Sequence, residues 1–199
     1  TPDKKHIITA DVFNGKIYKT SIETESSEII YSHKYGVNVA IEDSTGSVWF
    51  TQSTENQNEE RLFKALDKAV PDGALYRIPI SKDGTFSKPE LVLKNLYFAN
   101  GFYIDEKRNK LYLSEMMKNR VLSFDLDILT GSVSNQTTLA VIPTPDNMEL
   151  NSEGKLWVAS PLSNQIYSVD PENGEHFVVF DAQTQIGLQN MEKAISRME

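Results

Sequence analysis

Short runs in which apolar and polar residues alternate follow one another along most of the chain, which is the pattern of half-buried β-strands. Three stretches share one order: an alternating run, a polar turn, and a second run centred on Trp49, Tyr112 or Trp157. The aromatic residue lies 12 positions after Val37 and Asn100, and 11 positions after Asp146. These matched spacings predict a repeated hairpin.

One further apolar run follows each hairpin, at 74–78, 120–124 and 165–169, and a second comes next at 90–93 and 138–141. Residues 7–31 contain runs of the same kind. Four short antiparallel strands in a unit of about 40–50 residues are typical of a propeller blade, whereas a β-sandwich with similar hairpins is the alternative. The pattern therefore predicts an all-β fold, a single β-propeller domain over residues 1–199.

The number of blades indicates a partial ring. A chain of 199 residues holds about four blades of this length, and a closed propeller of four blades is uncommon. We therefore interpret the chain as a fragment of a larger propeller.

Two segments depart from the strand pattern and predict helices. Residues 56–70 have apolar residues at helical spacing, and Pro71 to Gly73 ends that pattern. We expect this insert to lie as a partial lid over the face where Asn100 opens. The second segment, 183–199, places Leu188, Met191, Ile195 and Met198 on one helical face.

Composition excludes several classes of function. The net charge of −8, with basic residues scattered along the chain, argues against nucleic-acid binding. The absence of cysteine excludes disulfides, thiolate metal sites and cysteine nucleophiles. No apolar run approaches the roughly 18 residues of a membrane span, and the N-terminal residues do not form a signal peptide, which leaves the compartment open.

The common catalytic motifs are absent from the sequence. There is no nucleophile elbow, zinc-protease helix, phosphate loop or dinucleotide fingerprint. The histidines His6, His33 and His176 are far apart and are interpreted as structural or surface residues. Glu115 is assigned either to the channel mouth or to a solvated strand end. The aromatic residues Trp49, Tyr112 and Trp157 are predicted to pack in the core.

Four stretches carry a family resemblance: LYFANG at 96–101, LSE at 113–115, TPDN at 144–147 and LWVA at 156–159. Their order and spacing resemble the strictosidine synthase-like branch of the six-bladed propellers. That group also includes gluconolactonase (the senescence-marker-protein-30 group) and paraoxonase. The resemblance covers about residues 35–170. It implies a divalent cation in the central channel, held by Asn, Asp and Glu oxygens from the inner strands.

The resemblance places Asn100 and Asp146 at the metal-ligand position, and Asn147 matches an extra ligand of the paraoxonase-like members. Equivalent inner-strand positions meet around the propeller axis, and amide and carboxylate oxygens suit Ca²⁺. In the first repeat the aligned residue is Val37, and Asn38 lies one step along, on the opposite face unless a bulge turns it. The alternative for Asn100-Gly101 and Asp146-Asn147 is left-handed turn chemistry.

Two acidic residues of the family lie outside this pattern. The family's glutamate ligand belongs to an opening blade that has no counterpart here, and the strictosidine-type catalytic glutamate would lie beyond residue 199. With few protein ligands, we expect weak calcium binding.

Three functions are compatible with this pattern. The first is metal-dependent hydrolysis of a lactone or related ester, a small-molecule substrate, with the cation polarising the carbonyl. Asp146, or water that it orients, would then act as nucleophile or base. The second is a non-catalytic propeller that binds a ligand and has lost the metal site, which Val37 favours. The third is amine–aldehyde condensation of the strictosidine synthase type.

Overall fold

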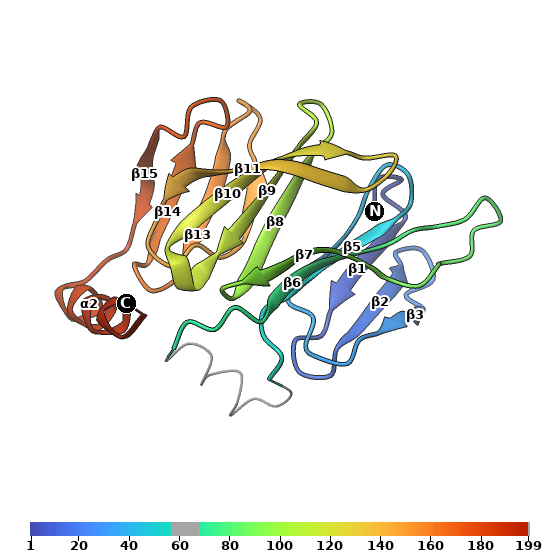
Figure 1. Ribbon diagram of the computed structural model, residues 1–199, viewed down its shortest axis with the longest axis horizontal. Coiled ribbons are helices and arrows are strands. Elements are labelled where there is room, and N and C mark those ends of the chain that lie inside the picture. Colours follow the sequence, from blue (N-terminus) through green and yellow to red (C-terminus); the bar gives the residue numbers. More distant parts are fainter. Residues whose placement is uncertain (57–67, 199) are drawn as a thin grey trace.

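The computed structural model describes residues 1–56 and 68–198, and its strands form four antiparallel sheets (Figure 1). Blade 1 contains three strands, and blades 2, 3 and 4 contain four strands each, joined in chain order. The strands are β1 (His6–Ala10), β2 (Lys16–Ser21) and β3 (Ser27–Ser32) in blade 1; β4 (Ala40–Glu42), β5 (Val48–Gln52), β6 (Gly73–Ile78) and β7 (Glu90–Leu96) in blade 2; β8 (Ala99–Asp105), β9 (Lys110–Glu115), β10 (Arg120–Asp127) and β11 (Ser132–Val141) in blade 3; and β12 (Met148–Leu150), β13 (Leu156–Ser160), β14 (Gln165–Val169) and β15 (His176–Asp181) in blade 4.

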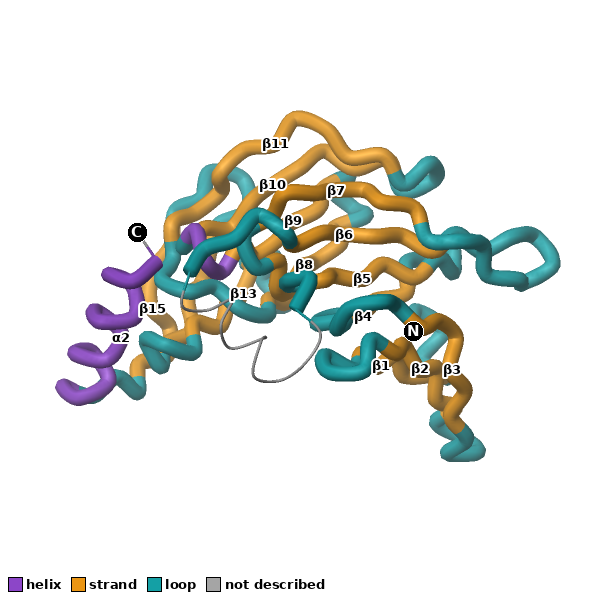
Figure 2. Tube along the Cα trace, turned by 60° about the horizontal axis from the view of Figure 1, so that its bottom comes forward, coloured by secondary structure: helices purple, strands orange, loops and turns teal. Residues whose placement is uncertain are grey.

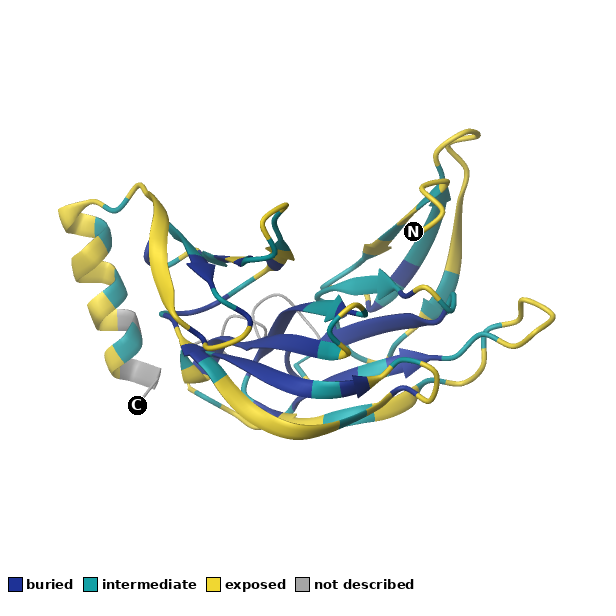
Figure 3. Ribbon diagram, turned by 90° about the horizontal axis from the view of Figure 1, so that it is seen from above, coloured by how far each residue is buried: buried dark blue, intermediate teal, exposed yellow. Residues whose placement is uncertain are grey.

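The blades stand side by side in an open arc, with blade 1 at one end and blade 4 at the other (Figures 2 and 3). Trp49, Tyr112 and Trp157 lie on the second strand of three different blades, and the predicted partial propeller is thereby confirmed. The helix α2 (Gln185–Met198) occupies the second predicted helical segment and lies beside β15. The predicted helix at 56–70 and its lid position fall mostly on 57–67, which lie outside the described residues.

Polar side chains at one position close the turns of the inner hairpins. Oδ1 of Asp43 accepts a hydrogen bond from Thr45 N at 2.8 Å. In the next two blades, Oδ1 of Asp105 and of Asn151 accepts from a backbone N–H two or three residues further on. Short side chains that bind their own backbone favour tight turns, although the turn of blade 3 has one residue more than the turns of blades 2 and 4.

The core consists of layers between neighbouring blades. Trp49 is fully buried against β8, β9 and β10 of blade 3, and its Nε1 donates to Asp43 Oδ2 at 2.7 Å. Tyr112 is fully buried in the next layer, among residues of blade 4. Each blade therefore covers the second-strand aromatic residue of the blade before it.

Trp157 is an exception to this rule, and its predicted core position is wrong. Its side chain is 46% exposed, and Phe177 and Phe180 of β15 are 66% and 56% exposed. The register places Trp157 opposite Ser168, which is paired with Phe177, so both aromatic side chains lie on one face of the sheet. No blade among the described residues covers that face, and Figure 3 shows β15 exposed along its length.

Candidate functional site at the start of the inner strands

The inner strands β4, β8 and β12 begin at the same end of three consecutive blades. Asn38 N donates to Thr51 O at 2.9 Å, and Asp146 N donates to Ala159 O at the same distance. The next backbone hydrogen bond is also equivalent. Thr51 N donates to Val39 O, and Ala159 N donates to Asn147 O, so the acceptor in each blade is the residue after the asparagine or aspartate. Asn38 and Asp146 therefore hold the same backbone position in their blades.

This equivalence corrects the alignment of the first repeat. Val37 does not hold the position; its side chain is fully buried in the core between blades 1 and 2. β8 has a bulge at Asn100 and Gly101, which lie between the pairs Ala99–Glu115 and Phe102–Leu113. The extra residue of blade 3 lies in the turn between β8 and β9: Tyr112 follows its strand partner by nine positions, whereas Trp49 and Trp157 follow theirs by eight. This explains why Asn100 precedes its aromatic residue by 12 positions, whereas Asn38 and Asp146 precede theirs by 11.

The amides of Asn38 and Asn100 make equivalent contacts. Asn38 Nδ2 donates to Ser53 Oγ at 2.8 Å, and Asn100 Nδ2 approaches Met116 Sδ at 3.5 Å. Ser53 and Met116 each lie four positions after the aromatic residue of their own blade. Sequence reasoning missed both, because a serine and a methionine share no recognisable chemistry.

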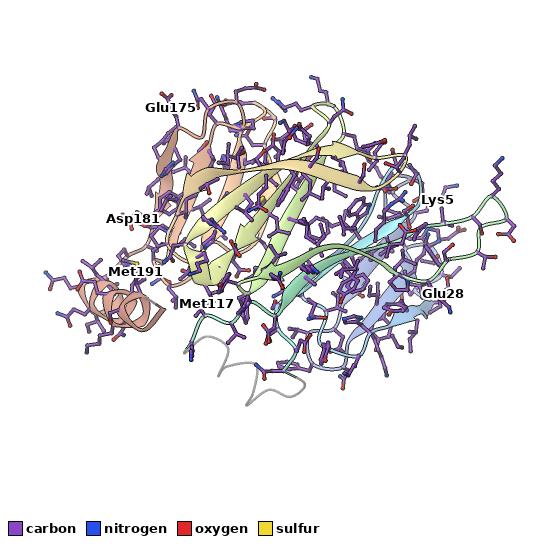
Figure 4. All side chains as sticks on the ribbon, viewed as in Figure 1. Lys5, Glu28, Met117, Glu175, Asp181 and Met191 are labelled. Carbon is purple, nitrogen blue, oxygen red and sulfur yellow. The ribbon has the colours of Figure 1, made fainter. Side chains whose placement is uncertain are left out.

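Asn100 contains an acceptor without a partner. Its side chain is only 4% exposed, and its Oδ1 has no hydrogen-bond partner among the described residues. A buried acceptor that is left unsatisfied costs about 1–3 kcal/mol, so this oxygen favours a nearby cation or a donor such as water. Met117, the neighbour of Met116, is labelled in Figure 4 at this end of blade 3.

Asp146 is half-buried beside Asn100. Burial raises the pKa of the Asp146 carboxyl, while the side chain of Asn100 and the backbone N–H of Asn147 partly oppose the rise. Asn147 itself is exposed, and its Oδ1 lies against Gly101. The structure therefore brings the side chains of Asn100 and Asp146 together, with Asn147 at the edge.

Gly101 allows the two inner strands to approach. A Cβ at this position would lie 2.5 Å from Asn147 Cα and 2.7 Å from Asp146 O, both of them backbone atoms. None of Asn100, Gly101, Asp146 and Asn147 has a positive φ, so neither dipeptide forms a left-handed turn. Close packing of strands, and not turn chemistry, explains the glycine.

Two other candidates do not join this site. Glu115 is 1% exposed, accepts from Tyr97 N at 2.8 Å and pairs with Arg120 at 2.6 Å. It is thus a buried ion-pair partner and not the solvated strand end that was one of its two assignments. His33 Nε2 shares a hydrogen bond of 2.8 Å with Gln52 Oε1 and packs against Phe50, and burial lowers the pKa of its ring.

The donor set suits an oxygen-coordinated cation but has little charge. It consists of two amide oxygens and one carboxylate, which are hard ligands. Within residues 1–56 and 68–198, no three His, Cys, Asp or Glu side chains are grouped so that they could hold a metal ion. The residues therefore fit calcium in ligand type, with Asp146 as the only charged ligand among them, and six to eight oxygens are the usual number.

A cavity lies elsewhere, at the other end of the inner strands. It has a volume of about 750 Å³ and is bordered by the far ends of the inner strands, including Asp43, Glu106 and Glu149. Asn100 and Asp146 do not line it. We place the chemistry at the start of the strands because the unpartnered amide oxygen is there. In the described part of the chain, no helix has the length and apolarity needed to cross a bilayer.

The solved structures that resemble the chain are propellers of related type. A gluconolactonase from Xanthomonas campestris superposes with a TM-score of 0.68 at 18% identity, over 90% of this chain and 60% of that one. A calcium-binding regucalcin from Agrobacterium tumefaciens has a TM-score of 0.64 at 14% identity, over 87% and 56%. At these identities the likeness shows the fold.

Sequence comparison gives longer relatives and a family. Strictosidine synthase from Catharanthus roseus is 26% identical over 162 residues, which are 80% of this chain and 42% of the relative. Regucalcin from Xenopus laevis is 33% identical over 81 residues, 39% of this chain and 27% of the relative. The chain thus spans less than half the length of either. Residues 32–186 match the model of the SMP-30/gluconolactonase/LRE-like region, and the chain belongs to that family.

Proposed function

We propose that this chain contains the cation site of a hydrolase that acts on a lactone or a related ester. The observation that supports it most is that Asn38, Asn100 and Asp146 lie at the start of consecutive inner strands, with Asn100 beside Asp146 and its Oδ1 buried and without a partner among the described residues. Membership of a family that includes gluconolactonases supports the substrate class.

The three side chains have separate roles in this proposal. Asn38 and Asn100 supply neutral oxygens and Asp146 the charge that would hold Ca²⁺. The bound ion would polarise the substrate carbonyl as a Lewis acid. Asp146, or water that it orients, would act as nucleophile or base.

The test combines ion binding with hydrolysis. We expect calorimetric titration to show weak calcium binding, and Asp146→Asn to abolish it, because the substitution removes the only charged ligand we identify. Lactone opening, followed by proton release, should fall by at least about 100-fold in the same variant. Asp170→Asn is the control, since this carboxylate pairs with Lys155 on the surface of the same blade. Equal calcium binding by Asp146→Asn and the wild type would reject the proposal.

One observation favours a binding module without catalysis. A site with a single anionic ligand holds calcium weakly, and the small charge is what a propeller that has lost the metal site would show. Condensation of the strictosidine synthase type ranks lower, because its catalytic glutamate is implied beyond residue 199. A folded chain that binds lactones with calcium absent, and opens none, would establish the binding module.

A further inference from the structure

The hydroxyl of Ser53 connects two neighbouring inner strands. Ser53 is 2% exposed, and its Oγ donates to Ala99 O at 2.8 Å while it contacts Asn38 Nδ2, also at 2.8 Å. Thr51, two positions earlier and fully buried, donates from Oγ1 to Asn100 O at 2.9 Å. Both contacts cross from blade 2 to the first residues of β8 in blade 3.

This arrangement determines which way the Asn38 amide faces. A serine hydroxyl has one proton, and Ser53 uses it on a carbonyl oxygen, which can only accept. Towards Asn38 the hydroxyl must therefore accept, and only the NH₂ group can donate. Oδ1 of Asn38 is thereby turned away from Ser53.

The same logic applies to Asn100 with a different partner. The thioether of Met116 can only accept, so the Nδ2 group of Asn100 faces it and Oδ1 does not. Met116 lies at the position that corresponds to Ser53 in the next blade. Thioether sulfur is a weaker acceptor than a hydroxyl, so the orientation is held less firmly at Asn100 than at Asn38.

We infer that Ser53 is a positioning residue, which orients the amide of Asn38 so that Oδ1 is presented to the cation and couples Asn38 to the strand of Asn100. This role rests on the proposed function. Partners that orient a ligand from behind contribute to metal affinity although they do not touch the ion, typically by 10–100-fold.

A double-mutant cycle tests the inference. We would titrate the chain with terbium(III), which takes the same oxygen ligands as calcium, and follow its luminescence. Ser53→Ala should weaken binding about tenfold in the wild-type background and have no further effect in the Asn38→Ala background. Ser123→Ala is the control, because Ser123 is a buried serine in β10. An unchanged affinity, or the same loss in both backgrounds, would overturn the inference.

A second measurement needs no ion. The side-chain NH₂ resonances of Asn38, assigned through Asn38→Asp, should shift and exchange faster with solvent in Ser53→Ala, because their acceptor is removed. Resonances that stay unchanged would overturn the positioning role. If the wild-type chain bound no ion while these resonances shifted, the proposed function would fail and the orientation of Asn38 by Ser53 would stand.

Discussion

Replacing Gly101 by alanine is the sharpest test of how the site is assembled. The new Cβ would lie 2.5 Å from Asn147 Cα and 2.7 Å from Asp146 O, whereas ordinary contacts begin at 3.4 Å. Both contacts are backbone atoms, so β8 and β12 would have to separate by roughly 1 Å. Overpacking of this kind costs about 1–3 kcal/mol, which in a chain of this size lowers Tm by about 2–12 °C.

The same separation should move Asn100 away from Asp146. We therefore expect Gly101→Ala to lower both Tm, measured by circular dichroism, and calcium affinity, measured by calorimetry. Gly84→Ala is the matched control: its φ of +84° makes the alanine strained, but nothing lies within 4 Å of the new Cβ. It should reduce stability and leave calcium affinity unchanged. Unchanged Tm and affinity in Gly101→Ala would refute the close-packing argument.

Three other substitutions test separate parts of the structure. Arg120→Met should destabilise the chain by about 3 kcal/mol in urea unfolding, because it leaves the buried carboxylate of Glu115 without its cationic partner. The double variant that also carries Glu115→Gln should recover part of this stability, because it contains no unpaired buried charge. Asp146→Asn should raise Tm at pH 7 without divalent ions. Burial raises the folded-state pKa of Asp146, so the protonated carboxyl favours folding. That contribution to stability is lost as pH rises through the folded-state pKa. The stability advantage of Asp146→Asn over the wild type should therefore vanish in acid. Met116→Leu, which removes the sulfur acceptor with little change of volume, should weaken terbium binding less than Ser53→Ala does, with Tm unchanged within about 2 °C.

The blades could be predicted from the sequence because their signal is local. Alternation, a turn and a second run centred on Trp49 or Tyr112 specify a hairpin without knowledge of the rest of the fold. The position of Asn38 could not be predicted, because one extra residue in the turn between β8 and β9 shifts the aromatic spacing by one. Alternation in the strands does not reveal the length of the turn between them, and an alignment by spacing therefore selected Val37.

The exposure of Trp157 and the contact between Ser53 and Asn38 could not be predicted from the sequence for a different reason. Trp157 holds the same strand position as Trp49, and equivalent positions predict equivalent burial; what differs is the neighbouring blade, which no local pattern reveals. Ser53 acts through a neighbour in space, Asn38, that lies 15 positions earlier in the chain. Only the fold shows that the two residues touch.

The contrast between the two tryptophans makes the open face of blade 4 visible to fluorescence. Trp49 is fully buried, with its indole N–H bonded to Asp43, so aqueous quenchers cannot reach it. Trp157, 46% exposed, is the accessible one of the only two tryptophans in the sequence. Iodide or acrylamide should therefore quench one emission component and leave the other, and anything that covers the face around Phe177 and Phe180 should protect it. The chain thus contains its own optical probe at the end of the arc.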